Sequence, residues 1–234
     1  MIFHLVKRTD LSTPSAGLLI WADYVAHAAG LGRSGFRRSL DKYRETRESG
    51  DKEHRRETDV AASSISPQKL YGVPVGLMFF EGAPRILSAG VMVPGLVVGD
   101  PERVVVEAYP GVLARQLIGR RGYKQDTRSK QTSVQVDARM DILTALRSGA
   151  VHTSHGLLVH APDTFCADPS GDRLDALLCA VQAAWSWTHR EEVFANLPRS
   201  AAREGWIADP SVRCRKVSPN PLPEAEAKTS SAKL

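Results

Sequence analysis

Residues 103–118, RVVVEAYPGVLARQLI, decide the fold that we expect for this chain. The three consecutive valines at 104–106 favour an extended strand that is buried on both faces, as in a sheet covered by helices. We therefore predict a strand at residues 103–108. Tyr109-Pro110-Gly111 ends this strand, and residues 112–118 are expected to form a helix.

Apolar residues at helical spacing flank this stretch on both sides. They predict helices at 18–29, 34–47, 72–89, 133–148 and 172–188, and Gly30 and Gly32 end the first of them. Helix 133–148 is expected to bury Val136, Met140, Leu143 and Leu146. Two further short strands are predicted at 156–159 and 204–209. Strands that alternate with helices predict an α/β fold, a mixed sheet flanked by helices.

Composition narrows the class of protein. The chain has 234 residues, of which 42% are hydrophobic, and this is enough for a packed core. No apolar run approaches the roughly 18 residues of a membrane span, and the start of the chain does not resemble a signal peptide, so we expect a cytoplasmic protein without a membrane partner. Its three cysteines contain no CxxC pair, which argues against a thiolate zinc site. The net charge of +5 permits a nucleic-acid partner without requiring one.

The distribution of apolar and polar residues divides the chain into three expected segments. Residues 1–17 are expected to be an irregular N-terminal segment, and residues 18–210 the α/β domain. Residues 211–234 are expected to form a disordered tail, because they are too polar to offset the entropy of ordering.

Three carboxylates are the strongest candidates for chemistry. Glu107 ends an otherwise apolar strand, where a buried carboxylate is costly unless it binds a cation or accepts good hydrogen bonds. Asp172 and Asp175 lie three residues apart at the start of one helix, and so share a helical face. Together they suggest a site for Mg²⁺ or Mn²⁺ with Glu107, Asp172 and Asp175 as ligands. The alternatives are a Glu107 that faces water and two aspartates that favour the helix dipole.

Two basic clusters could contact phosphate groups. The first, in and beside a predicted loop at 119–131, contains Arg115, Arg120, Arg121, Lys124, Arg128 and Lys130, with Tyr123 placed to stack on a base. The second, Arg37 to Arg56, is interleaved with acids and is expected to be a solvated helical face. His152 and His155 have no metal-binding spacing and are expected to lie in a loop and to serve solubility.

Four segments carry a resemblance to a known family. They are RRETDVAASSISPQKLYGVPVGLMFFEGAPRIL, VVVEAYPGVLARQLIGRRGYKQDTR, DPSGDRLDALLCAVQAAW and EGWIADP, and they occur in this order across residues 18–210. The chain resembles a family of predicted nucleases with an RNase H-like fold, catalogued as domain of unknown function 429. The resemblance implies a five-stranded mixed sheet flanked by helices, with Glu107 on its fourth strand and Asp172 and Asp175 on the closing helix. It also implies that Lys124, Arg128, Arg55 and Asp59 line the same cleft.

One departure from that family bears on activity. Enzymes of RNase H-like fold use an aspartate on the first strand of an N-terminal hairpin, and the roughly 17 residues before the first predicted helix are too short for those strands. We therefore expect the N-terminal strands to be missing, as in a truncated or degenerate relative. Three functions stay open: a metal-dependent nuclease, a non-catalytic nucleic-acid-binding or scaffolding module of the same fold, and a phosphotransferase, for which no glycine-rich phosphate loop is present.

Overall fold

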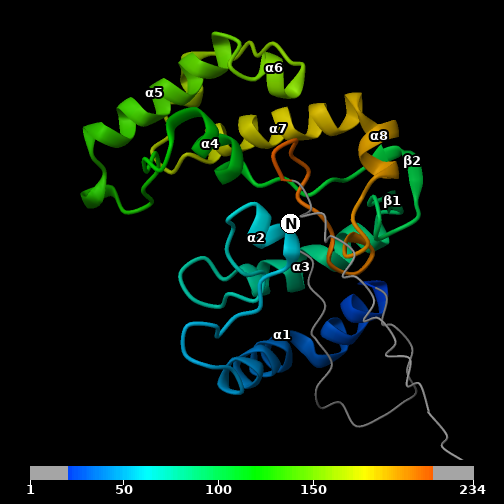
Figure 1. Ribbon diagram of the computed structural model, residues 1–234. Helices are drawn as coiled ribbons and strands as arrows, with labels where there is room; N and C mark the ends of the chain where they lie inside the picture. The colour runs from blue at the N-terminus through cyan, green and yellow to red at the C-terminus, as the bar shows by residue number, and fades with distance from the viewer. Residues whose placement is uncertain (1–20, 213–234) are drawn as a thin grey trace, which may run out of the picture.

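The computed structural model describes residues 21–212, and this part of the chain is mostly helical, with one small sheet at its edge, near α8 (Figure 1). The strands are β1 (Val91–Met92) and β2 (Asp100–Val104). The helices are α1 (Trp21–Glu45), α2 (Glu57–Ala61), α3 (Val75–Ser88), α4 (Pro110–Ile118), α5 (Ser133–Arg147), α6 (His152–His155), α7 (Asp172–Thr188), α8 (Arg190–Ala195) and α9 (Ala201–Glu204), with 3₁₀ turns η1 (Arg128–Lys130) and η2 (Asp163–Phe165). The described residues are thus of mixed α/β class and mostly helical.

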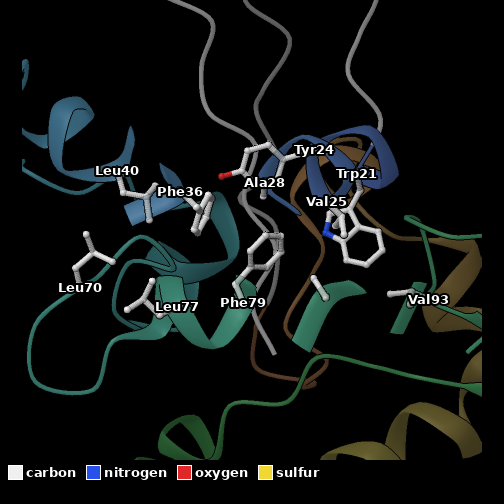
Figure 2. Packing of buried hydrophobic residues seen from close by; sticks show 11 residues of the cluster. Trp21, Tyr24, Val25, Ala28, Phe36, Leu40, Leu70, Leu77, Phe79 and Val93 are labelled. Atoms are coloured by element: carbon white, nitrogen blue, oxygen red, sulfur yellow. The ribbon is translucent and has the colours of Figure 1, made fainter. Parts of the chain in front are cut away.

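Helices α1 and α3 form the first hydrophobic core, shown in Figure 2. The two helices that we predicted at 18–29 and 34–47 are one bent element, because Gly32 takes φ 65° and ψ 165° inside α1. This bend lets residues from both halves of α1 reach α3: the ring centroids of Tyr24 and Phe36 lie 5.6 and 6.3 Å from that of Phe79. Packing of the apolar faces, as the spacing predicted, is what holds these helices together.

The second hydrophobic core lies between α4, α5, α6 and α7, away from α1 (Figure 1). Helix α7 has the bounds that its spacing predicted, and Leu174 and Leu178 are completely buried. The expected stripe on α5 is wrong in part. Val136 and Met140 are exposed, whereas Arg139 is buried and donates hydrogen bonds to the carbonyl oxygens of Tyr123 and Cys166. Because Arg139 donates to these buried carbonyl oxygens, its side of α5 faces the interior, and Val136 and Met140 face the solvent.

The predicted central strand is the largest correction to the fold. Only its first two residues belong to β2, whose middle is exposed, and Val105 and Val106 are half-buried without continuing the strand. Strand β2 pairs in parallel with β1 in an irregular register, which aligns Val91 with Asp100 and Met92 with Val104. Among residues 21–212 the sheet has these two strands, so no neighbouring strand covers the valines on both sides. The five-stranded sheet implied by the resemblance is not present in this range.

The two remaining predicted strands are also wrong. Residues 156–159 are irregular and follow the short helix α6, because the left-handed Gly156 ends that helix and the chain continues without a pairing partner. Residues 204–209 form a single bridge, in which Ile207 lies parallel to Glu107. The amide of Ala208 donates to the carbonyl oxygen of Glu107 over 2.8 Å. This bridge fixes the end of the described chain beside Glu107.

Some sequence-based predictions fall on other parts of the chain. The irregular segment at 1–17 and residues 213–234 of the expected tail lie outside the described residues. Val212, inside the range expected to be tail, is buried beside Ile207 and Val112, so the packed region extends to that residue. In residues 21–212, no helix is both long and apolar enough to cross a membrane.

Candidate functional site

Glu107 is buried, and its partner is an arginine. Both of its carboxylate oxygens accept hydrogen bonds from the guanidinium of Arg56, at 2.8 Å from Nη1 and 2.7 Å from Nη2. Arg56 itself is 0% exposed and Glu107 5% exposed. A two-pronged pair of this kind satisfies a carboxylate that would otherwise be costly to bury. The structure therefore excludes the alternative in which Glu107 faces water.

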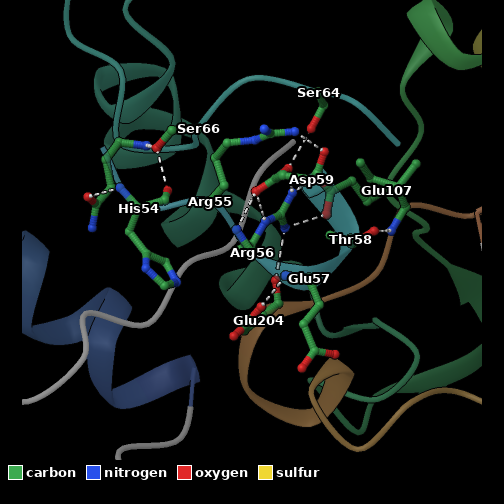
Figure 3. A network of polar contacts seen from close by, with 12 residues as sticks. His54, Arg55, Arg56, Glu57, Thr58, Asp59, Ser64, Ser66, Glu107 and Glu204 are labelled. Carbon is green, nitrogen blue, oxygen red and sulfur yellow. Dashed lines mark hydrogen bonds and ion pairs between the residues drawn. The ribbon is translucent and has the colours of Figure 1, made fainter. Parts of the chain in front are cut away.

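Arg56 joins three segments that are far apart in the sequence (Figure 3). Its Nε and Nη2 donate to the carboxylate of Asp59, at 2.9 and 2.8 Å, and its Nη1 also donates to the carbonyl oxygen of Glu204. Ser64 Oγ donates to Asp59 over 2.7 Å. Burial alone would lower the pKa of Arg56, but the charges of Glu107 and Asp59 outweigh it and raise the pKa above its ordinary value. The guanidinium is thus a permanent cation between two buried carboxylates.

Asp175 lies in a different cluster. Its carboxylate accepts a hydrogen bond from the hydroxyl of Tyr123 and forms an ion pair with Lys124. Burial, and then the hydrogen bond to Asp175, raise the pKa of Tyr123. Lys124 comes from the basic loop and Asp175 from the first turn of α7, so this contact attaches the loop to the helix.

The donor set does not fit a two-metal centre. Glu107 is occupied by Arg56 and Asp175 by Lys124, whereas Asp172 is exposed at the first position of α7, where an acid favours the helix dipole. Within the described part of the chain, no group of three or more His, Cys, Asp or Glu side chains could hold a metal ion. The structure thus does not assemble Glu107, Asp172 and Asp175 into the expected Mg²⁺ or Mn²⁺ site.

We expect Mg²⁺ or Mn²⁺ to leave the stability of this chain unchanged. A metal that binds the folded state at 100 times its dissociation constant adds about 2.7 kcal/mol to the free energy of unfolding. Urea unfolding in millimolar Mg²⁺, in millimolar Mn²⁺ and in excess EDTA should give the same midpoint. A metal-dependent rise in the midpoint that Asp175→Asn removes would restore the metal site.

The larger of two basic hollows lies beside α2, with a volume of about 780 Å³. It is lined by the loops before and after α2 and by the end of α1, and its cations are Arg44, Lys52, Arg55 and Lys69. Glu53 is the acidic residue among those that line it, and it pairs with Arg44 at 3.4 Å. Tyr71 also lines this hollow.

The second hollow, of about 560 Å³, lies along α4 and the loop that follows it. Its cations are Arg115, Arg120, Arg121 and Lys124, and none of the described residues that line it is acidic. Ser63 lines both hollows, so they meet at this residue. We call the two hollows together the basic groove.

The backbone at this junction is unusual. Ser63 has φ 49°, in the left-handed region that residues other than glycine seldom adopt. Arg115 holds it there by donating hydrogen bonds to the carbonyl oxygens of Ala62 and Ser63. Strain of this kind is concentrated at functional sites, where the surrounding structure maintains it.

Most cations of the basic groove lack a carboxylate partner. Arg44, Arg121 and Lys124 form ion pairs with carboxylates, whereas the other five, Lys52, Arg55, Lys69, Arg115 and Arg120, form none with the described residues. The groove consequently has an excess of positive charge on its lining. An anion with several charges is the ligand that such a lining favours.

The sequence-predicted phosphate contacts are thus only partly brought together. Arg121, Lys124 and Arg55 line the groove, although Arg121 pairs with Asp141 and Lys124 with Asp175. Arg128 lies in η1 and lines neither hollow. Asp59 is buried against Arg56 and does not line the groove. The resemblance had placed four of these residues, Lys124, Arg128, Arg55 and Asp59, in one cleft.

Sequence reasoning missed a second buried network. His155, expected in a loop for solubility, is 0% exposed in helix α6, and its Nε2 lies 3.6 Å from the carboxylate of Asp209. Gln182 on α7 donates to Asp209 over 2.7 Å. No periodic pattern marks these residues, because each comes from a different segment. The sequence did contain a signal for Arg56. Asp59 follows it by three residues, and Glu107 was expected to need a cation if it was buried.

Comparison of the chain with protein-family models, with curated proteins and with solved structures gives no match.

Proposed function

We propose that this chain is a non-catalytic nucleic-acid-binding module that holds the sugar-phosphate backbone in the basic groove. The observation that supports the proposal is the joining, at Ser63, of two hollows with four Lys or Arg side chains each and one carboxylate in total. Phosphate contacts by such side chains supply most of the affinity of proteins that bind nucleic acid without reading its sequence.

The nuclease hypothesis stays a prediction, together with the RNase H-like fold and the Mg²⁺ or Mn²⁺ that it requires. The geometry favours binding over catalysis, because two-metal cleavage needs carboxylates that converge on the ions. Here Glu107 serves the fold through Arg56, and Asp175 positions Lys124. A binding module needs neither group to reach a phosphate.

The groove predicts which cations set the salt dependence of binding. Replacing Arg55 and Arg120 together with Ala removes one unpaired cation from each hollow. Each lost phosphate contact should lower the slope of log K against log salt by roughly 0.7 for a single strand, so the double variant should lose roughly 1.4. Fluorescence anisotropy with a labelled oligonucleotide over a salt series measures this slope.

A matched control is available in the same region. Arg128 and Lys130 are also exposed cations, in η1, and they line neither hollow. The Arg128→Ala/Lys130→Ala variant removes the same charge and should keep the slope of the unmodified chain. If this variant lowers the slope and the groove variant does not, the nucleic acid binds elsewhere and the proposal fails.

A further inference from the structure

The basic groove contains three tyrosines, which differ in their exposure. Tyr123 is 8% exposed, and its hydroxyl donates to Asp175. Tyr109 is half-buried, and its ring lies so close to Gly111 that an added Cβ there would meet Tyr109 Cζ at 2.8 Å. Both rings also lie beneath a cation of the second hollow, with Arg115 Cζ 5.6 Å from the Tyr109 centroid and Lys124 Nζ 5.6 Å from the Tyr123 centroid. Little of the Tyr123 ring is therefore left for a base to stack on. This corrects the expectation that Tyr123 stacks on a base.

Tyr71 differs from both in its exposure. It is 57% exposed and lines the larger hollow. Two cations lie over its ring, with Lys69 Nζ at 5.0 Å and Arg44 Cζ at 5.5 Å from the centroid. The same hollow also contains the unpaired cations Lys52 and Arg55. An exposed aromatic ring among cations is the arrangement that binds a base by stacking while the flanking phosphates contact the cations.

We infer that the larger hollow binds an unpaired base of a single-stranded nucleic acid, stacked on Tyr71, while the strand continues past Ser63 along the second hollow. This inference rests on the proposed function and adds its substrate class. A duplex keeps its bases stacked on one another and offers this ring only its phosphates. Every base has an apolar face, so the site accepts any sequence, and the contact is equally available to DNA and RNA.

The experiment compares polyanions that offer the ring an unpaired base with polyanions that do not, and each ligand is compared across protein variants. Affinities of the unmodified chain, Tyr71→Leu and Tyr71→Phe are measured for a single-stranded DNA, a single-stranded RNA, the matching DNA duplex and inorganic polyphosphate. We expect Tyr71→Leu to weaken single-strand binding roughly tenfold, because a stacked base is lost. Tyr71→Phe keeps the ring and should bind as the unmodified chain does. Duplex and polyphosphate affinities should be the same for all three proteins.

Tyr43 provides the control for a general effect of losing a tyrosine. It also lies beneath a cation, with Arg47 Cζ at 5.4 Å from its centroid, but it lines neither hollow. Tyr43→Leu should leave single-strand affinity unchanged. If Tyr71→Leu has no effect while all polyanions bind through the groove cations, the stacking inference is overturned and the proposed function stands. If no nucleic acid binds at all, both are overturned.

Discussion

Replacing Arg56 with Met is expected to lower the free energy of unfolding by about 3–5 kcal/mol. The substitution leaves Glu107 and Asp59 buried without the guanidinium that satisfies both carboxylates. The loss is a large fraction of the roughly 5–15 kcal/mol that keeps a typical domain folded. Urea unfolding followed by circular dichroism measures it. Arg55→Met is the matched control: this neighbour is exposed, and its loss should cost less than about 1 kcal/mol.

A second variant separates the ion pair from the packing of the side chain. Glu107→Gln alone should also destabilise, because it weakens the pair with Arg56. In the Arg56→Met/Glu107→Gln double variant one unpaired charge is gone, so the total loss should be smaller than the sum of the two single losses. Additive losses would mean that the two side chains do not interact. Any loss of activity in Glu107→Gln must therefore be compared with its stability before it is assigned to chemistry.

The helices could be predicted because their information is local. The apolar spacing of 172–188 and of 72–89 falls on α7 and α3 within a few residues, and Gly32 bends α1 where the first predicted helix was to end. Each of these signals lies within one or two helical turns of the residues that it positions. It was harder to predict which face of each helix is buried. On α5 the buried face depends on Arg139, and the carbonyl oxygens that accept its hydrogen bonds come from distant segments.

The strands could not be predicted in the same way. A run of valines indicates that a segment suits a strand buried inside a sheet. The neighbouring strands that would bury it must come from elsewhere in the sequence. Among the described residues, β1 pairs with Val104 and a single bridge joins Ile207 to Glu107, just after the run, and so the valines stay half-buried. Pairing partners are separated by many residues, and one sequence alone does not identify them.

At the candidate site, too, the local sequence predicted one part and contacts between distant segments decided the rest. The reasoning that Glu107 must be matched by a cation if buried agrees with the structure, but the cation is the guanidinium of Arg56. Arg56 belongs to a run of mixed charge that was expected to be solvated, and its neighbour Arg55 does face the solvent-exposed groove. Adjacent residues of identical type thus have opposite environments, and this difference depends only on the tertiary fold.

Asp209 gives the stability of this chain a predictable dependence on pH. Burial alone would raise its pKa, but the His155 ring and hydrogen bonds from Gln182 and Ser211 lower it to about 2, from an ordinary value of 3.8. The contact with His155, at 3.6 Å, is longer than a hydrogen bond, so the bonds from Gln182 and Ser211 at 2.6–2.9 Å carry most of this effect. The ionised carboxylate is therefore favoured by the folded state.

The sign of the effect follows from this lowered pKa. The stabilising contribution is complete above the unfolded pKa, near pH 4, and is lost as the pH falls toward 2. A shift of this size corresponds to about 2.5 kcal/mol at pH 7 and roughly half of that at pH 3. Asp209→Asn should therefore destabilise the chain by about 2–3 kcal/mol at pH 7, and by clearly less at pH 3.

The comparison requires urea unfolding of both proteins at each pH, because acid also titrates other carboxylates. Taking the difference between the unmodified chain and Asp209→Asn removes those shared contributions. Asp163→Asn serves as the control: its carboxylate is exposed and pairs with Arg147, so its effect should be below about 1 kcal/mol at both pH values. If Asp209→Asn costs the same at pH 7 and pH 3, the charge of Asp209 contributes nothing. The network of His155, Gln182 and Asp209 would then act through packing and neutral hydrogen bonds alone.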